Sequence, residues 1–275
     1  MDKKKQLSFW DKKLLSLNFT IISAFLGIET AILSFFTLDD LIRKIIFFIT
    51  LILILFVYVI TYFYNKNMTK KEIVINNNIV KIIFGDIFQQ EGIKVIAFNE
   101  YFDTLVDNSI IDASSLNGQA INKYINNIET FDNNISNDEN CKNNIIENNY
   151  TRVSGKKTKY KLGTCYRDNN FIAVAFTKFD DSNKAYLNLI DYLPCLVNFW
   201  KQLEKVYIDG FDIIIPLLGT GKTRSDFLQR ISYQEIINIM LKMLEFSDVK
   251  FSHNNSIIFV LPQDIKNEIS LYKVR

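Results

Sequence analysis

The stretch Ile79-Val-Lys-Ile-Ile-Phe-Gly-Asp-Ile87 joins a β-branched run to a glycine and a carboxylate. β-Branched and aromatic residues favour strands, and Gly-Asp is typical of the turn that follows one. A similar run, Glu72 to Ile75, lies just before it, and Asn76-Asn77-Asn78 separates the two. Two short runs with such a turn between them predict a β-hairpin. Because Gly85-Asp86 could also be an ordinary turn, its meaning depends on what the rest of the chain places beside it.

Strand and helix patterns alternate along the chain that follows. Strands are predicted over residues 94–99, 159–166, 171–177, 211–216 and 256–261, and helices from about Gly118, over 182–206 and over 226–246. Such alternation predicts an α/β domain, a three-layer sandwich with a mixed sheet. Ligands bind to sheets of this kind at the carboxyl ends of the strands. Residues 131–150, dominated by Asn, Asp and Glu, are predicted to form a low-complexity insertion or a mobile loop.

The N-terminal 64 residues have a different character. Residues 14–36 are apolar except for Glu29 and a few small polar residues, and residues 45–64 carry no charge. A bilayer core needs about 20 apolar residues per helix, so both runs are predicted to be transmembrane helices that form a hairpin. The chain is therefore divided into a membrane segment over 1–64, a linker over 65–72 and a soluble domain over 73–275.

The basic residues that flank the two runs predict their orientation. The first run is preceded by Lys3, Lys4, Lys5, Lys12 and Lys13, and the second is followed by Lys66, Lys70 and Lys71. Positive charge is retained on the cytoplasmic side of membranes, so both chain ends are predicted to be cytoplasmic. A signal peptide is the alternative for the first run. No small-residue cleavage site follows that run, however, and the second run begins at once.

The first predicted helix has two contrasting faces. Ser23, Gly27 and Ala31 recur every four residues, a pattern that lets helix backbones approach closely. Asn18, Phe25 and Glu29 project roughly opposite. A carboxylate at the centre of a membrane costs about 2.5–3.5 kcal/mol on insertion scales and usually marks a function. We therefore predict that Glu29 faces other subunits or a water-filled path; the alternative is that it is protonated or reaches the outer interface.

Composition excludes several kinds of site. The formal net charge of +2 and the lack of a dense Lys/Arg cluster in the soluble part argue against a nucleic-acid partner. The three cysteines (Cys141, Cys165 and Cys195) form no Cys-x-x-Cys pair, so neither a zinc site nor a disulfide framework is expected. The single histidine, His253, lies among Asn and Ser residues, so we predict neither a Ser/His/Asp nor a Cys/His catalytic arrangement.

Four motifs lie where a predicted strand passes into a loop. They are Gly85-Asp86-Ile87, Asn99 at the end of its strand, Ser114-Ser-Leu-Asn-Gly-Gln119 and Pro216-Leu-Leu-Gly-Thr-Gly-Lys-Thr223. Small residues in the last two let backbone N–H groups approach phosphates, and the following helix N-termini add positive potential. A carboxylate such as Asp86 can accept a hydrogen bond from an exocyclic amine.

In this order and spacing the four motifs resemble the macro domain over roughly residues 79–261. The resemblance implies a macro-like sandwich that binds an ADP-ribose derivative and needs no cofactor or metal. The ligand-binding residues that it implies are Asp86 and Ile87 for adenine, Asn99 at its strand end, Ser115, Leu116, Asn117 and Gly118 for the diphosphate, and Gly219, Thr220, Gly221, Lys222 and Thr223 for phosphate and the distal ribose.

Two departures from the macro-domain pattern argue against catalysis. Hydrolytic macro domains carry a second Asn three residues after the first, where this chain has Phe102. The late Gly-rich loop also lacks its usual later Gly and has Arg224-Ser225 instead. We therefore predict a binding module rather than an enzyme, with a membrane-tethered ADP-ribosyl hydrolase as the alternative.

Two predicted membrane helices followed by such a domain resemble the effector subunit of type II Thoeris, a bacterial anti-phage system. The resemblance implies a protein of the bacterial inner membrane whose signal is an ADP-ribose conjugated to histidine, made from NAD by a TIR-domain partner. It also implies that the signal drives self-assembly and that the assembled hairpins damage the lipid bilayer.

A P-loop NTPase is the alternative from another class. Leu217-Leu-Gly-Thr-Gly-Lys-Thr223 is close to a Walker A loop, but the position that requires glycine holds Pro216. No later strand ends in acidic residues that could hold magnesium.

Overall fold

The computed structural model describes residues 7–169, 171–180, 182–221, 231–251 and 255–274. Contacts divide the chain into two compact units. One comprises the residues up to Thr69 together with Asn267–Lys273, and the other comprises Lys70–Lys266 with the last residues of the chain.

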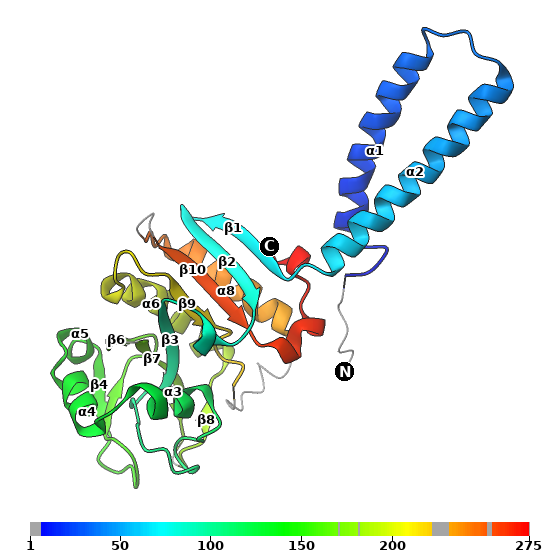
Figure 1. The fold of residues 1–275 in the computed structure, drawn as a ribbon. Coiled ribbons are helices and arrows are strands. Elements are labelled where there is room, and N and C mark those ends of the chain that lie inside the picture. The colour runs from blue at the N-terminus through cyan, green and yellow to red at the C-terminus, as the bar shows by residue number, and fades with distance from the viewer. Residues whose placement is uncertain (1–6, 170, 181, 222–230, 252–254, 275) are drawn as a thin grey trace. The chain divides into compact units, whose positions relative to one another are not determined.

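The first unit is built on two long helices, α1 (Lys12–Leu33) and α2 (Asp40–Lys66), that form a hairpin (Figure 1). Both are long and apolar enough to cross a membrane. They differ from the predicted runs at their ends, because α1 begins where the Asp11 carboxylate accepts hydrogen bonds from the first-turn N–H groups of Lys13 and Leu14. α2 takes up charged flanking residues at both ends. The connection to the first strand is therefore shorter than the predicted linker over 65–72.

The polar face of α1 points toward α2. The hydroxyl of Thr50 donates a hydrogen bond of 2.7 Å to Oε1 of Glu29. Asn18 is buried and its amide donates to the carbonyl of Leu14, one turn earlier. The small-residue face is exposed instead, and a Cβ added at Gly27 would meet no atom within 4 Å. Within one chain, therefore, Asn18 and Glu29 are sheltered in the hairpin, whereas the small face is left open.

C-terminal residues pack at the base of this hairpin. Leu7, Leu14 and Tyr58 form a buried cluster that Phe9, Tyr62 and Tyr272 cover. The ammonium group of Lys273 lies 3.0 Å from the Asp11 carboxylate. The 3-10 turns η2 (Gln263–Glu268) and η3 (Leu271–Lys273) lead the chain into these contacts.

The second unit contains a mixed sheet with the strand order β1-β2-β10-β9-β3-β7-β6. Its strands are β1 (Lys70–Ile75), β2 (Asn78–Phe84), β3 (Ile93–Asn99), β6 (Cys165–Arg167), β7 (Phe171–Phe179), β9 (Ile213–Pro216), β10 (Ser256–Leu261) and, paired with β7, β8 (Ala185–Tyr186). The five central strands from β2 to β7 are parallel, and the outer pairings are antiparallel. The predicted hairpin is confirmed as β1 and β2, with Asn76 and Asn77 at positive φ in its turn.

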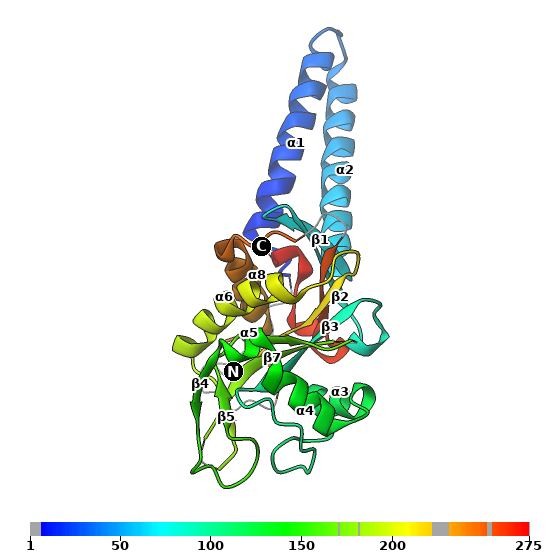
Figure 2. The ribbon, with the colours of Figure 1, turned by 90° about the vertical axis from the view of Figure 1, so that its left-hand side faces the viewer.

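Helices cover both faces of this sheet (Figures 1 and 2). α6 (Leu189–Val206) and α8 (Tyr233–Ser247) lie on one face, and α3 (Leu116–Tyr124), α4 (Ile128–Asn137) and α5 (Glu139–Lys142) lie on the other. β7 is buried on both sides, as a central parallel strand should be. Alternate residues Phe171, Ala173 and Ala175 face the cluster under α3 and α4, whereas the ring of Phe176 packs on Tyr192 of α6. The predicted three-layer α/β sandwich with a mixed sheet is confirmed.

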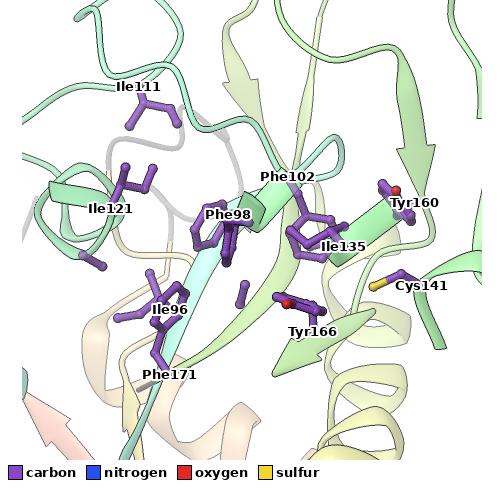
Figure 3. Packing of buried hydrophobic residues seen from close by; sticks show 14 of the residues in the cluster. Ile96, Phe98, Phe102, Ile111, Ile121, Ile135, Cys141, Tyr160, Tyr166 and Phe171 are labelled. Atoms are coloured by element: carbon purple, nitrogen blue, oxygen red, sulfur yellow. The ribbon is translucent and has the colours of Figure 1, made fainter. Parts of the chain in front are cut away.

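The alternative of a mobile loop over residues 131–150 was wrong, because the segment has regular secondary structure. This segment forms most of α4, all of α5 and the strand β4 (Ile145–Asn148), which pairs with β5 (Thr158–Tyr160). Figure 3 shows why: Ile135 and Cys141 point into the same aromatic core as Phe98 and Phe171. Asp138, one of the acidic residues of this segment, caps α5, and Asn127, just before the segment, caps α4.

Three other predicted elements have different boundaries in the structure, because caps and strand pairing set their ends. The predicted helix over 182–206 begins only at Leu189, because Asn188 caps it and β8 precedes it. The predicted strand over 159–166 is divided between β5, which pairs with β4, and β6, which pairs with β7. In the predicted helix over 226–246, residues 226–230 lie outside the described residues, and α8 begins after a capping box at Ser232.

Candidate functional site

The parallel strands bring three of the four motifs to the same end of the sheet, where the strands have their carboxyl ends; this row of strand ends is called the edge below. β2 ends at Phe84, which lies opposite Leu261 at the end of β10. Val260, just before it, lies opposite Pro216 at the end of β9, and β3 continues the edge with Asn99 at its own end. Gly85-Asp86, the Gly219 loop and Asn99 therefore all follow carboxyl ends of parallel strands, as the sequence predicted.

Asp86 begins the 3-10 turn η1 (Ile87–Gln89) at one end of this edge. Its carboxylate accepts a hydrogen bond of 2.9 Å from the Phe88 N–H and is otherwise exposed, whereas Ile87 is buried. Burial raises the pKa of the Tyr124 phenol, and the negative charge of Asp86 raises it further. The Tyr124 ring lies 6.1 Å from that of Phe88. A carboxylate beside two aromatic rings suits a flat ligand group with an amine on its edge.

The N-terminus of α3 carries the third motif. Ser115 caps the helix: its hydroxyl accepts a hydrogen bond of 3.0 Å from the Gly118 N–H and donates one to the Asp112 carbonyl. A Cβ at Gly118 would lie 2.4 Å from that carbonyl oxygen. Glycine therefore serves here to pack α3 against the preceding loop. The side-chain oxygen of Asn117 is buried and accepts no hydrogen bond within the described residues, which leaves it available to a ligand donor.

The Gly-rich loop after β9 is described as far as Gly221. Gly219 has a φ of +85°, and the Thr220 hydroxyl donates a hydrogen bond of 2.7 Å to the Leu217 carbonyl. Gly221 is exposed, and a Cβ there would meet no atom of the described residues within 4 Å. The remaining predicted residues of this loop, Lys222 and Thr223, lie outside the described residues, as does His253.

A cavity of about 310 Å³ opens beside the ends of β3 and β7. Three predicted residues, Asn99, Ser115 and Asn117, line it. Its other polar lining residues are Asn108, Ser109, Asp112, Thr177, Asn183 and Lys184, none of which sequence reasoning had singled out. Asp86, Ile87 and the Gly219 loop are not part of this lining and lie elsewhere along the strand ends. The candidate site is thus the row of strand ends from β2 to β7, with the cavity at the β3–β7 end of that row.

Asn99 organises the backbone around this cavity. Its side-chain oxygen accepts hydrogen bonds from the N–H groups of Tyr101 and Asp103, at 3.0 and 3.2 Å. Its amide donates to the Asp103 carboxylate at 2.9 Å. That carboxylate forms a buried ion pair with Arg152, at 2.6 Å. Sequence reasoning named neither Asp103 nor Arg152 as a site residue, because 49 positions separate the two partners and nothing in the sequence pairs them.

Two further ionisable groups near the cavity have shifted pKa values. Burial raises the pKa of the Glu100 carboxyl above its usual value, and a hydrogen bond from the Phe179 N–H with the charge of Lys159 offsets this only in part. Burial lowers the pKa of the Lys156 ammonium, although the carboxylate of Asp132 beside it acts in the opposite direction. Both groups bind other parts of the protein, so these shifts reflect packing.

Among the described residues, no group of three or more His, Cys, Asp or Glu side chains could hold a metal ion. The three cysteines are free and buried, and burial raises the pKa of each thiol. At neutral pH these thiols are protonated and therefore weak nucleophiles.

Comparison with known proteins gives consistent results. A family described as the macro domain of the Thoeris protein ThsA matches residues 80–262. The chain is 36% identical over 265 residues to the Thoeris protein ThsA of Bacillus amyloliquefaciens (strain Y2), which covers 92% of this chain and 87% of that protein. A point mutant of the Oceanobacillus iheyensis macrodomain is similar with a TM-score of 0.45 and 16% identity, covering 75% of this chain and 96% of that one. For the same macrodomain with ADP the TM-score is 0.39 with 17% identity, over 75% and 95% of the two chains.

Proposed function

Because this chain belongs to the ThsA family of Thoeris proteins and carries that family's macro domain, we propose that it is a membrane effector of bacterial anti-phage defence that senses an ADP-ribose-type nucleotide. The observation that carries the proposal is the alignment of Asp86, the Gly219 loop and Asn99 along four adjacent parallel strands. Neighbouring strands lie about 4.8 Å apart, so the row from β2 to β3 spans roughly 14 Å. An extended dinucleotide-like ligand can contact several points along such a row.

The chemistry along the edge suits such a ligand. Asp86 offers an acceptor to an exocyclic amine beside the aromatic pair of Phe88 and Tyr124. The N-terminus of α3 and the glycines of the Gly219 loop present backbone N–H groups and positive potential to a diphosphate. Asn117, in the first turn of α3, also lines the cavity, and its side-chain oxygen has no hydrogen-bond donor among the described residues, which suits a hydroxyl or N–H donor of the distal group. We place the adenine, the diphosphate and the distal ribose in that order.

Binding without hydrolysis is the form of the proposal that we favour. Phe102, which stands where hydrolytic relatives carry a second Asn, is fully buried, and its ring packs 5.2 Å from that of Tyr160. It therefore contributes no polar group to the cavity. The signal that fits the family is an ADP-ribose conjugated to histidine, made by a TIR-domain partner. The alternative, a membrane-tethered ADP-ribosyl hydrolase, would share the binding residues.

The membrane part of the proposal concerns assembly. Two helices in one chain cannot enclose a pore, so membrane damage requires several chains. The exposed face of Ser23, Gly27 and Ala31 is open to another helix, and small residues allow the close approach that membrane helices use. Glu29 would exchange its bond to Thr50 for contacts in the assembled state. Ligand binding favours assembly only if the assembled form binds the ligand more tightly.

Calorimetry of the full-length protein in detergent with ADP-ribose tests the binding. Asp86→Ala should lower the affinity by roughly 1–3 kcal/mol, the cost of losing a charged hydrogen bond. The matched control is Asp209→Ala, because Asp209 is an exposed carboxylate just before β9, at the opposite end of the sheet. An equal loss in both variants, or no binding by the wild type, would contradict the proposed site.

Two activity assays separate the alternatives. Release of ADP-ribose from modified protein by the purified chain would favour the hydrolase. ATP hydrolysis that Lys222→Ala abolishes would favour the P-loop NTPase.

A further inference from the structure

Arg152 occupies an unusually complete binding site for a guanidinium group. The side chain is buried, and all five of its N–H groups have acceptors. Two fork onto the Asp103 carboxylate at 3.1 and 2.6 Å, two reach the Asn183 side-chain oxygen at 3.0 and 2.7 Å, and one reaches the Lys156 carbonyl at 2.7 Å. Such a planar fork is specific to arginine, since a lysine ammonium has three donors around one point.

The surrounding chain is shaped to admit this group. The ring of Tyr101 lies 4.0 Å from the guanidinium carbon and stacks against it. Gly155 also contacts this group: it has a φ of +88°, and a Cβ there would lie 2.6 Å from a guanidinium nitrogen. Only glycine leaves the guanidinium in place, because it has no Cβ and tolerates positive φ.

Arg152 joins the two chain segments that bound the cavity. Asp103 closes the turn that begins at Asn99, which lines the cavity after β3. Asn183 lines the cavity from the turn between β7 and β8, and its own φ is +56°. One guanidinium therefore ties both walls together, although Arg152 itself is not part of the lining.

We propose that Arg152 is a positioning residue that sets the width of this cavity and so determines affinity for the ligand group beyond the diphosphate. This inference rests on the proposed function, in which the adenine lies near Asp86 and the cavity takes the distal ribose. Without the fork, the Asn99 turn and the Asn183 turn lose their shared partner and separate. The adenine contacts at Asp86 and the diphosphate contacts at the Gly219 loop lie outside the cavity lining and do not depend on this tie. Ser115 and Asn117 do line the cavity, so a change in its width affects the diphosphate as well, but it affects the distal ribose more.

The test compares two ligands on the full-length protein in detergent. ADP-ribose carries the distal ribose and ADP lacks it, so the ratio of their affinities isolates the contribution of the group beyond the diphosphate. Arg152→Lys should weaken ADP-ribose binding about tenfold more than ADP binding, because lysine keeps the charge but cannot hold both walls. The control is Arg167→Lys, since Arg167 is an exposed arginine on β6.

A second pair of variants serves if Arg152→Lys does not fold. Gly155→Ala displaces the guanidinium while Arg152 remains, and it should lower the same ratio. Its control, Gly210→Ala, has nearly the same φ of +86°, but its Cβ would meet no atom of the described residues within 4 Å, so it reproduces the backbone strain without the contact.

The outcomes are distinct. A lower ADP-ribose to ADP affinity ratio in Arg152→Lys or Gly155→Ala, with both controls unchanged, supports the inference. An unchanged ratio, or an equal loss for both ligands, overturns it. If the wild type binds neither ligand, the proposed function itself fails, and the positioning role of Arg152 fails with it.

Discussion

Replacing Gly118 by alanine tests whether α3 packs directly against the backbone of the preceding loop. The new Cβ would lie 2.4 Å from the carbonyl oxygen of Asp112 and 2.9 Å from the Cα of Ala113. Ordinary contacts of a Cβ begin at 3.4 Å, so α3 or the loop must move by roughly 1 Å. Overpacking of this kind costs roughly 1–3 kcal/mol, and the better helix propensity of alanine offsets at most about 1 kcal/mol.

The expected net loss is therefore roughly 1–2 kcal/mol of unfolding free energy. For a unit of this size each kcal/mol lowers the Tm by about 2–4 °C, so the Tm should fall by roughly 2–8 °C. Thermal unfolding of the full-length protein in detergent, followed by the fluorescence of the fully buried Trp200, measures this. The affinity for ADP-ribose should fall as well, because Ser115 and Asn117 line the cavity from the displaced segment.

Gly221→Ala is the matched control. A Cβ there would meet no atom within 4 Å in the part of the chain that the structure describes, so the Tm should remain that of the wild type. If Gly118→Ala is as stable as Gly221→Ala, α3 does not approach the Asp112 carbonyl closely and the packing role assigned to Gly118 is wrong.

Three further predictions concern the membrane topology, a buried carboxyl and the hairpin. A cysteine at Leu41 should react with an impermeant thiol reagent on intact cells, and one at Val153, which is 93% exposed, only after lysis; the reverse pattern would contradict cytoplasmic termini. Because burial raises the pKa of Glu100 above its usual 4.5, the folded protein holds a proton that the unfolded chain has already lost between the two pKa values. Stability from this group therefore falls as pH rises through that window. Glu100→Gln should remove this contribution from the dependence of the Tm on pH. If the Tm of the variant and of the wild type depend on pH in the same way, the burial argument is refuted. A double-mutant cycle of Glu29→Gln and Thr50→Val should give a coupling of roughly 0.6–1.7 kcal/mol for hairpin unfolding in detergent, whereas additive effects would show that the hydrogen bond contributes nothing.

Local signals predicted most of the elements correctly. The hairpin of β1 and β2 followed from two β-branched runs around three asparagines, and β10 has the predicted bounds. These patterns are properties of residues a few positions apart, so they can be read without knowing what packs on them. The order of the motifs along the chain also indicated the macro-domain family of Thoeris proteins, and the comparisons confirm this family.

The helices of residues 131–142 show where composition misled. Asn and Asp dominate the segment, and their low helix propensity favours a loop. Phe131, Ile135 and Cys141 are nevertheless buried, and their burial beneath the aromatic core outweighs that propensity. The favourable energy comes from partners such as Phe98 and Tyr166, which lie far away in the sequence.

For this protein, the sequence alone determined the two apolar helices, the α/β class and the motifs at the strand ends, because hydropathy, strand propensity and glycine placement act within a few residues. Only the tertiary structure decided that Glu29 bonds to Thr50, that Gly118 packs on Asp112, and that Arg152 pairs with Asp103 behind the cavity. A buried ion pair is stable only when both charges leave water together with every donor satisfied. That condition depends on segments brought together by the sheet, and no pattern along the chain encodes it locally.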